Sequence, residues 1–457
     1  MVLCQDTDYV LLDEPLQRET AQGLLDYWAN VLHSLGAPDD DATLADFDPL
    51  RAPELLDALC PYVGLDAFQQ HDAEFFFGRS ALIRQLGEHL EQQRLLALIG
   101  PSGGGKSSLV RAGLIPLLMR SAAFSSESWA YPATVIPGSN PLAALDAALT
   151  NVDPRKTPLV LVIDQFEETF LLCRDAQLRS AFLDRLTAFV QQPAPPHRVI
   201  LTMRRDFVEA VGEAPAFKLL FDEADVYIPS LTAAELREAI EEPARKVGLK
   251  FEAGVIEQLV EELQGEIAAL PLLQFTLRRL WDRRERNRVT LAAYNAIGGG
   301  REALEHAADE LYDGLIPQNQ ETLRRILLRM VRPGLSEEFT SRRIPLSDLA
   351  SIPEDPARVS EIVQKLVAAR LVRLSPGESA DDTQIEIAHE ALIRNWKRLL
   401  GWLNDERGAL YKRRELTTAA DAWQRRGRPP KRCCAAMCGK RRKATTIGAR
   451  WSRSILR

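Results

Sequence analysis

The feature that most constrains the fold of this chain is a glycine-rich segment, GPSGGGKS, at residues 100–107. A short apolar run, LLALIG, lies before it at 95–100, and residues 106–119 have the composition of a helix. A glycine-rich turn between a strand and a helix lets successive backbone N–H groups point at phosphate oxygens, and the helix N-terminus adds partial positive charge. The segment therefore predicts a P-loop that binds a nucleoside triphosphate.

Two side chains of this loop have expected roles. We expect Lys106 to reach the β- and γ-phosphates and the Ser107 hydroxyl to ligate Mg²⁺. The residues expected around the phosphates are Gly100, Pro101, Ser102, Gly103, Gly104, Gly105, Lys106, Ser107 and Ser108. The predicted cofactors are therefore ATP or ADP, together with Mg²⁺.

A P-loop site also needs a second Mg²⁺ anchor, an acid at the tip of a neighbouring strand. Asp164 meets this requirement because it follows the apolar run LVLVI at 159–163. Glu167 and Glu168 come within one turn of it, and either could orient or deprotonate the attacking water. The sequence alone does not decide between the two glutamates, of which Glu167 is the preferred candidate.

Arg204 is a further catalytic candidate, because it follows the apolar run at 198–203. An arginine at a strand end could sense the γ-phosphate and supply charge where it develops in the transition state. The alternative is that Arg204 pairs with Asp206 or is simply exposed.

Between residues 95 and 230, short apolar runs alternate with helical stretches, which is typical of a parallel α/β sheet. The central runs are apolar throughout, as expected for strands that helices cover on both faces. We predict a five-stranded parallel sheet with strands at 95–100, 133–137, 159–164, 198–203 and 225–229. Helices are predicted between them, including 106–119 and 178–191.

From about residue 231 the pattern becomes helical, and we expect no further strands before residue 299. Residues 299–410 combine helices with one predicted hairpin, formed by LVRLS (371–375) and TQIEIAHE (383–390). Apolar residues with helical spacing from Val359 to Val367 predict an amphipathic helix before that hairpin. A helix beside such a hairpin is the plan of a winged helix.

The composition is that of an ordinary globular protein, with 46% hydrophobic and 26% charged residues. No apolar run approaches the roughly 20 residues that cross a bilayer. The first residues, MVLCQDTDYV, lack the basic and apolar regions of a secretory signal, and single cysteines such as Cys60 and Cys173 are typical of reduced thiols. We therefore predict a cytoplasmic protein that does not interact with a membrane.

Charge is unevenly distributed along the chain. Residues 411–457 carry 15 Lys and Arg against 2 acidic residues, a net +13, so the rest of the chain sums to −20 within the overall −7. Such a tail can act as a basic arm for nucleic acid. Because it lacks any periodic apolar pattern, we favour the interpretation that it is a disordered or out-of-frame end.

In their order along the chain, the motifs resemble one family. FFFGRSALIRQL, GPSGGGKSSLVRAGLIPLL, LVLVIDQFEETF and VILTMRRDF are similar to the STAND class, the signal-transduction ATPases with numerous domains, which are related to AAA+ and NACHT proteins. The resemblance is to the bacterial branch that often carries WD40 repeats. It continues through ALPLLQFTLRRLW and IAHEALIRNWKRLLGWL and covers roughly residues 61–428. It implies a switch that is closed with ADP, opens on a stimulus, exchanges ADP for ATP and then self-associates.

The resemblance also implies roles for individual residues. Gly78 and Arg79 match the motif that flanks the nucleotide base, and Arg204 matches the sensor arginine. Pro271 matches the helical-domain proline that packs on the base. Family members have Pro-Gly shortly before this proline, whereas this chain has Ile-Ala at 267–268, so the shape of that loop is expected to differ.

His389 lies at the end of the predicted hairpin, where related switches use a winged-helix histidine against the β-phosphate of ADP. A histidine there would hold the domain closed only while the diphosphate is bound. The alternative is that His389 packs in the core of the winged helix beside Trp396.

The expected organisation has five parts. They are an N-terminal helical stub and linker (1–60), a P-loop NTPase domain (61–230), an all-α helical lid domain (231–298), a winged-helix domain (299–410) and a tail that begins helically and becomes basic (411–457). We expect the sensor and effector modules of the switch to be missing or to reside in other chains.

The leading functional prediction is a slow, regulatory ATPase switch that controls signalling or defence assembly and oligomerises in the ATP state. A DNA-acting AAA+-type ATPase shares the combination of P-loop and winged helix. Its candidate recognition helix, RVSEIVQKLVAAR, offers few basic residues, so we rank DNA binding second. An ABC-transporter ATPase is disfavoured because no LSGGQ-like segment follows the P-loop.

Overall fold

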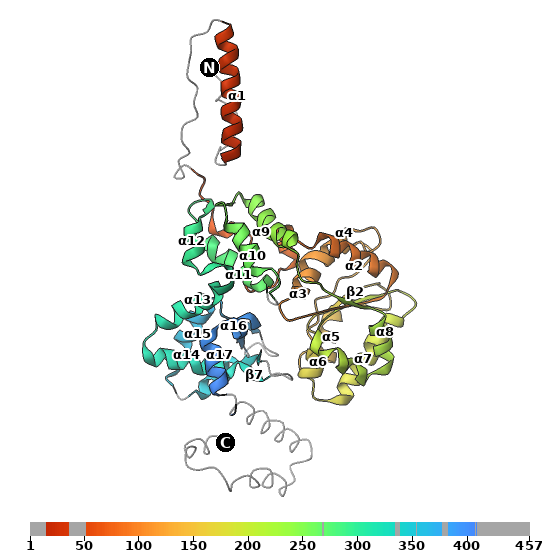
Figure 1. Ribbon diagram of the computed structural model, residues 1–457. Helices are drawn as coiled ribbons and strands as arrows, with labels where there is room; N and C mark the ends of the chain where they lie inside the picture. Colours follow the sequence, from red (N-terminus) through yellow and green to blue (C-terminus); the bar gives the residue numbers. More distant parts are fainter. Residues whose placement is uncertain are drawn as a thin grey trace.

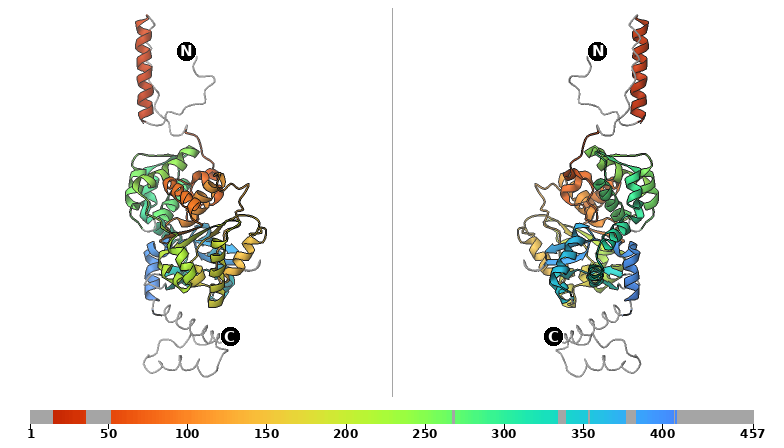
Figure 2. Two further views of the ribbon diagram at one scale, coloured as in Figure 1. Left: turned by 90° about the vertical axis from the view of Figure 1, so that its right-hand side faces the viewer. Right: turned by 90° about the vertical axis from the view of Figure 1, so that its left-hand side faces the viewer.

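The computed structural model describes residues 15–35, 52–266, 269–333, 339–352, 354–376, 383–406 and 408. A layered α/β part, a helical part and a carboxy-terminal part lie against one another, and helix α1 (Pro15–Ser34) stands apart from them (Figures 1 and 2). We refer to residues 233–313 as the helical part and to residues 317–406 as the carboxy-terminal part. The predicted tail at 411–457 lies outside the described residues, as do residues 1–14, 36–51 and 267–268.

The α/β part is built on a parallel sheet of four strands in the order β2-β3-β1-β4. The strands are β1 (Leu95–Gly100), β2 (Val160–Ile163), β3 (Arg198–Arg204) and β4 (Asp225–Tyr227). Residues of β1 and β2 are buried without exception, as their continuous apolar sequences require. Alternate side chains point to opposite faces, so Leu95 and Ala97 join one core cluster while Leu96 joins the other.

Helices cover both faces of this sheet (Figure 1). One face packs against α5 (Pro141–Leu149), α7 (Ala176–Gln191) and α8 (Pro215–Asp222). The other packs against α2 (Ser80–Gln92) and the helix after the P-loop, which runs as α3 (Lys106–Ser108), the π-helical turn η4 (Leu109–Leu114) and α4 (Ile115–Arg120). Shorter helical turns are η2 (Asp57–Leu59), η3 (Gln70–Phe75), α6 (Glu168–Leu171) and η5 (Arg205–Glu213).

The sheet has four strands where the sequence predicts five. Residues 130–135 run parallel to β2 but pair with it only at isolated bridges, Val135 with Ile163 being one. Pro132 and Pro137 flank the apolar stretch, and a proline has no N–H to donate to a ladder. The prediction of a strand at 133–137 is therefore wrong, although this segment does lie beside β2.

The helical part contains α9 (Ala233–Val247), α10 (Val255–Leu263), α11 (Ala269–Asp282), α12 (Leu291–Ala296) and α13 (Gly299–Asp313). The expectation of an all-α region is wrong in one detail. β5 (Lys250–Phe251) and β6 (Arg288–Val289) form a short parallel pair beside these helices. Two-residue strands are too short to leave a periodic signal in the sequence.

The carboxy-terminal part confirms the predicted amphipathic helix and hairpin. Its helices are α14 (Pro317–Arg329), η6 (Leu346–Ser351), α15 (Pro356–Ala368), α16 (Glu390–Asn395) and α17 (Lys397–Asp405), and its strands are β7 (Val331–Pro333), β8 (Phe339–Ser341), β9 (Ile344–Pro345), β10 (Val372–Pro376) and β11 (Thr383–Ile387). β10 pairs antiparallel with β11, and β9 extends that sheet. A second antiparallel pair, β7 with β8, was not predicted, because its strands are only three residues long.

One apolar core joins the helical and carboxy-terminal parts. It contains Tyr62 and Leu65 together with buried side chains between Leu231 and Leu403, and α13 packs against both α11 and α16. The Tyr62 hydroxyl donates to the carbonyl of Ile240 at 2.9 Å, which fixes the segment before α2 to the helical part. None of the helices that the structure describes combines the length and the apolar composition that a membrane span requires.

We predict that Trp396→Ala strongly destabilises the protein. The Trp396 side chain is fully buried, its indole Nε1 donates to Asp309 at 2.8 Å, and its ring meets Tyr312 and Trp402 edge-on. Truncating a buried tryptophan costs about 3–5 kcal/mol of unfolding free energy. Urea unfolding followed by far-UV circular dichroism measures the change, and Trp28→Ala serves as the control because Trp28 is 58% exposed. Equal unfolding midpoints for the two variants would contradict the role of Trp396 as a buried core residue.

Candidate functional site

The glycine-rich segment forms a tight loop between β1 and the helix that follows. Gly103 and Gly105 have φ angles of +83° and +79°, which residues with a side chain rarely adopt. Lys106 folds back over the loop, and its Nζ donates to the carbonyls of Gly100 at 3.1 Å and Pro101 at 2.7 Å. Burial lowers the pKa of Lys106, while Glu167 and Asp164 oppose this effect. The loop therefore holds a partly desolvated cation at the tip of β1.

Sheet register brings three predicted residues to one edge. Gly100 pairs with Arg204, so the P-loop starts beside the end of β3. Ile163 pairs with Leu201, which places Asp164 next to Thr202 at the same edge. The sequence led us to expect the acid on a strand next to β1, but β3 lies between β1 and β2. The carboxyl ends of all three strands still meet.

Asp164 is almost completely enclosed, at 1% exposure, and is saturated with donors. Its Oδ1 accepts from the Ser107 hydroxyl at 2.9 Å, the Gln165 N–H at 3.1 Å and the Thr202 hydroxyl. Its Oδ2 accepts from Arg111 at 2.7 Å. The predicted pair of Ser107 and Asp164 is therefore in direct contact, and Thr202 and Arg111 complete a set that the motif alone did not reveal.

The two glutamates after Asp164 occupy different surroundings. Glu167 is buried and accepts from the backbone N–H of Arg204 at 3.2 Å. Desolvation raises the pKa of Glu167 to about 7, although Lys106 acts in the opposite direction. Glu168 accepts from the N–H of Gly138 at 3.2 Å, and burial raises its pKa while Arg343 of the carboxy-terminal part lowers it. Only Glu167 is close to both the lysine and the strand-end arginine.

His389 reaches the P-loop from the carboxy-terminal part. A Cβ placed on Gly103 would lie 2.9 Å from Cε1 of His389 and 3.2 Å from Cγ of Pro271, so both side chains rest against that glycine. The Nδ1 of His389 accepts from the backbone N–H of Ala391 at 3.0 Å, which places the proton of the neutral ring on Nε2. Desolvation lowers the pKa of His389 to about 4. A neutral imidazole with one N–H donor therefore faces the loop.

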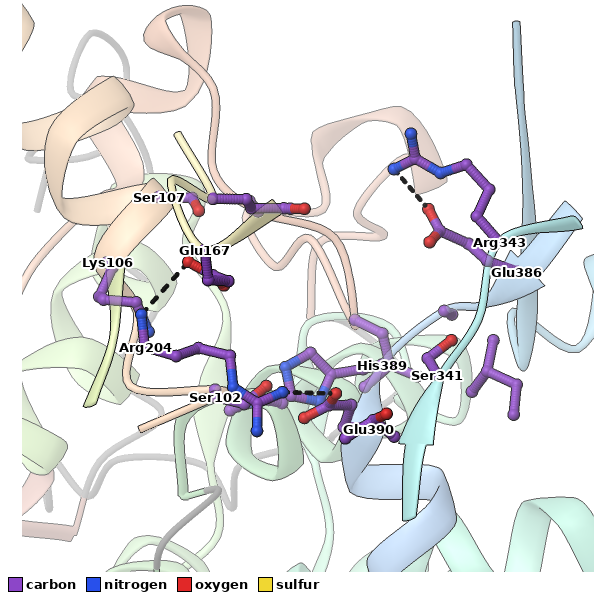
Figure 3. Close-up of a pocket in the computed structure, with 18 of the residues that line it drawn as sticks. Ser102, Lys106, Ser107, Glu167, Arg204, Ser341, Arg343, Glu386, His389 and Glu390 are labelled. Carbon is purple, nitrogen blue, oxygen red and sulfur yellow. Dashed lines mark hydrogen bonds and ion pairs between the residues drawn. The ribbon is translucent and has the colours of Figure 1, made fainter. Parts of the chain in front are cut away.

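Arg204 connects the sheet to the carboxy-terminal part. Its guanidinium pairs with Glu390 at 3.0 Å and with Asp206 at 2.6 Å, and only 13% of its side chain is exposed. Pairing with Asp206 was one of the two alternatives for Arg204, whereas the pair with Glu390 was not anticipated. Glu390 follows His389 in the chain. Two consecutive residues therefore contact the α/β part, His389 at Gly103 after β1 and Glu390 at Arg204 at the end of β3 (Figure 3).

These groups, apart from the enclosed Asp164 and the neighbouring Arg111, line one cavity of about 1230 Å³, which exceeds the roughly 300–1,000 Å³ of typical ligand pockets. Ser102, Lys106, Ser107, Glu167 and Arg204 face Ser341, Arg343, Glu386, His389 and Glu390 across it (Figure 3). Further lining comes from Gly64, Leu65, Asp66, Ala67, Phe68, Leu270, Pro271 and Gln274. The cavity therefore lies where the α/β, helical and carboxy-terminal parts meet.

Gly78 and Arg79 do not line this cavity. The Arg79 guanidinium donates to the carbonyl of Pro229 at 2.7 Å, and a Cβ on Gly78 would lie 2.4 Å from the carbonyl of Glu235. Arg79 thus connects the start of α2 to the segment before α9, and Gly78 packs against the first turn of α9. The upstream residues that do line the cavity are 64–68 and Phe76, which lie ahead of Gly78 and Arg79.

Arginines make the carboxy-terminal wall of the cavity basic. Arg332 on β7 and Arg342 directly after β8 line it, together with Arg343 and Arg373. Burial lowers the pKa of Arg332, and the nearby charge of Arg342 adds to this effect. Glu386 partly balances the wall, because it pairs with Arg373 at 2.7 Å and with Arg343 at 3.3 Å. An anionic ligand would thus meet cations on both sides of the cavity.

The oxygen donors at the strand tips suit Mg²⁺. A hydroxyl and a carboxylate, those of Ser107 and Asp164, lie 2.9 Å apart beside the phosphate loop, and hard oxygen ligands are what this ion prefers. Mg²⁺ bound there would neutralise phosphate charge. Among the described residues, no group of three or more His, Cys, Asp or Glu side chains offers another metal site.

Comparisons with solved structures find matches of low sequence identity. The ORC1 protein of Aeropyrum pernix, solved in complex with DNA, is 17% identical over 70% of this chain and 93% of its own, with a TM-score of 0.39. Cdc6p from Pyrobaculum aerophilum is 13% identical over 78% and 100%, with a TM-score of 0.36. The RuvB Holliday junction branch migration motor of Thermotoga maritima is 19% identical over 73% and 98%, with a TM-score of 0.34. TM-scores below 0.5 are too low to support conclusions about this chain.

A comparison with curated proteins finds no match. A protein-family comparison, in contrast, gives a match over most of the chain. The model of the family described as Novel STAND NTPase 1 matches residues 61–431, which include the P-loop, Asp164, Arg204 and His389. The chain therefore belongs to the Novel STAND NTPase 1 family.

Proposed function

We propose that this protein is a nucleotide-dependent switch that binds ATP or ADP with Mg²⁺, hydrolyses ATP slowly and thereby controls a signalling or defence assembly. One observation carries the proposal. His389 of the carboxy-terminal part rests against Gly103 of the P-loop, so a phosphate in the loop would contact the P-loop and the carboxy-terminal part at once. A ligand that binds one arrangement of two parts better than another shifts their equilibrium.

In the proposed complex, the loop residues 100–108 hold the phosphates. Lys106 exchanges its bonds to the carbonyls of Gly100 and Pro101 for bonds to phosphate oxygens. Ser107 would ligate Mg²⁺, and Asp164 would anchor the ion. The nucleotide base would lie between residues 64–68 and the side of α11 that carries Leu270 and Pro271. This position differs from the one near Gly78 that the family motif implied.

Glu167 is the proposed general base for hydrolysis. A catalytic base works best when its pKa is near the working pH, and burial raises the pKa of Glu167 to about 7. Glu168 faces Gly138 and the basic wall, so we assign it a positioning role between the two parts. This assignment selects one of the two alternatives that the sequence left open.

His389 and Arg204 are the proposed nucleotide sensors. The Nε2 proton of His389 can be donated to a β-phosphate oxygen, which favours the closed arrangement while ADP is bound. Arg204 is held by Glu390 at 3.0 Å, and a γ-phosphate would compete with that carboxylate for the guanidinium. ADP would leave the Arg204–Glu390 pair intact, whereas ATP would weaken it. The carboxy-terminal part, proposed to be a winged-helix domain, would then move and allow self-association.

The alternative of a DNA-acting ATPase lacks a supporting observation in helix α15, the candidate recognition helix. Its Arg358 pairs with Glu354 at 3.0 Å, and its Lys365 pairs with Glu361 at 2.7 Å. Both cations are thus partly neutralised by acids one turn earlier in the chain. We therefore propose the switch alone.

The first test is the nucleotide content of the purified protein. We expect stoichiometric ADP, because the closed arrangement encloses the phosphate loop beneath His389 and Pro271. Lys106→Ala should abolish the bound nucleotide, while Lys156→Ala, at a side chain that is 82% exposed, should retain it. Chromatographic analysis of nucleotide released on denaturation measures both. Sites without nucleotide in the unaltered protein would contradict a resting ADP state and favour a rapidly turning-over enzyme.

A second test concerns retention of ADP. His389→Ala removes one hydrogen bond to a charged phosphate, so we expect ADP to dissociate about tenfold faster or more. Release of a fluorescent ADP analogue into excess ADP gives the rate. His71→Ala is the matched control, because the side chain of His71 is 80% exposed. An unchanged release rate in His389→Ala would remove the histidine from the mechanism.

A third test uses pH to identify the base. Glu167 must be ionised to accept a proton, so kcat/KM for ATP hydrolysis should rise about tenfold per pH unit below pH 7 and level off above it. Glu167→Gln should lower hydrolysis by roughly 10²–10⁴-fold while ATP still binds. Glu168→Gln should keep the pH profile. If Glu168→Gln abolished the pH dependence of kcat/KM and Glu167→Gln kept it, Glu168 would be the general base.

A further inference from the structure

Arg111 is a charged residue of the site to which no role has yet been assigned. It lies on the helix after the P-loop, four residues beyond Ser107, within the π-helical turn Leu109–Leu114. Its Nη2 donates to Oδ2 of Asp164 at 2.7 Å, and its Nη1 donates to Oε1 of Gln69 at 3.2 Å. Its side chain is 22% exposed, so the guanidinium is largely withdrawn from water.

The Arg111–Asp164 pair solves an electrostatic problem. Asp164 is 1% exposed, and an ionised carboxylate buried in this way is costly unless a cation and hydrogen-bond donors accompany it. Lys106 does not fill this role by contact, because its Nζ donates to the carbonyls of Gly100 and Pro101. Within the described part of the chain, Arg111 is the cation that forms an ion pair with Asp164.

Arg111 is also held in place from its far side. Gln69 accepts from Arg111, and the Gln69 backbone N–H donates to Asp72 at 2.8 Å in the capping box of η3. The neighbouring backbone N–H of Phe68 donates to the Ser108 hydroxyl at 3.1 Å. The segment before α2 therefore braces the guanidinium against the carboxylate, and Arg111 is not a freely rotating surface side chain.

From these contacts we infer that Arg111 is a built-in counter-cation of the Mg²⁺ site, which lets the protein hold ADP with little dependence on Mg²⁺. The inference rests on the proposed nucleotide site. Without metal, Arg111 neutralises Asp164, so the carboxylate does not repel the phosphates in the neighbouring loop. With metal, the ion and the guanidinium compete for the same carboxylate, which weakens Mg²⁺ binding.

This arrangement suits a switch that rests with a diphosphate. ADP carries less negative charge than ATP. One fixed cation beside Asp164 therefore offsets a larger share of the repulsion between the protein's carboxylates and the phosphates when the nucleotide is ADP. ATP places a further charged phosphate in the cavity and gains more from Mg²⁺. Arg111 would thus make metal dependence differ between the two nucleotides, as a positioning residue that acts through Asp164.

The experiment compares ADP affinity in excess EDTA with ADP affinity in excess Mg²⁺. For the unaltered full-length chain we expect the two Kd values to agree within about threefold. Arg111→Gln should weaken ADP binding in EDTA by about tenfold or more, equivalent to roughly 1.4 kcal/mol, and Mg²⁺ should restore it. Arg111→Lys, which keeps the charge, should have a Kd for ADP in EDTA between those of the unaltered chain and Arg111→Gln. Isothermal titration calorimetry on protein from which the bound nucleotide has first been removed gives both constants.

Two comparisons guard against a merely structural effect. Arg185→Gln, at an arginine 38% exposed and paired with Asp146, should leave the ratio of the two Kd values unchanged. In an Asp164→Asn background the buried charge is absent, so adding Arg111→Gln should no longer weaken metal-free binding. Two results would overturn the inference. One is a ratio of the two Kd values in Arg111→Gln that equals the ratio in the unaltered chain. The other is a loss of metal-free ADP affinity on adding Arg111→Gln that is as large in the Asp164→Asn background as in the unaltered chain. Failure of the unaltered chain to bind ADP in either buffer would instead overturn the proposed nucleotide site.

Discussion

The closed arrangement of this protein depends on the close approach of His389 and Pro271 to Gly103. A Cβ on that glycine would lie 2.9 Å from one side chain and 3.2 Å from the other, so only a glycine fits between them. Gly105 is similarly restricted, since its Cβ would lie 2.6 Å from Leu270. The loop glycines therefore have two functions. They give the backbone its left-handed turns, and they let the helical and carboxy-terminal parts approach the place where phosphates are proposed to bind.

Local sequence predicted the parts of the site that follow from local structure. The P-loop and Asp164 each come directly after a buried apolar strand, and that context is readable without tertiary information. The strand at 133–137 failed because Pro132 and Pro137 interrupt pairing, which an apolar pattern does not reveal. The pairs β5–β6 and β7–β8 were missed because strands of two or three residues have no measurable period.

Partners of the site residues were harder to predict than the residues themselves. Arg204 and Glu390 are 186 positions apart, and Arg111 and Asp164 are 53 apart, so no spacing rule connects them. Resemblance to a family pointed to His389 but not to the carboxylate beside it. It also pointed to Gly78 and Arg79, which the structure uses to fasten α2, while residues 64–68 line the cavity. Motifs identify chemistry, whereas the pairing of charges depends on how the parts pack.

Charge balance in the cavity links these observations to switching. Burial holds His389 neutral, raises the pKa of Glu167 and lowers that of Lys106, so the ligand-facing groups carry less charge than their residue types suggest. A bound polyphosphate would stabilise the cationic form of Lys106. It would also oppose Glu390, whose carboxylate shares Arg204 with the proposed γ-phosphate position. In the proposed switch, each added phosphate would therefore strengthen contacts with the P-loop and weaken the Arg204–Glu390 contact between the α/β part and the carboxy-terminal part. A difference of one phosphate would thus be converted into a difference in the position of the carboxy-terminal part.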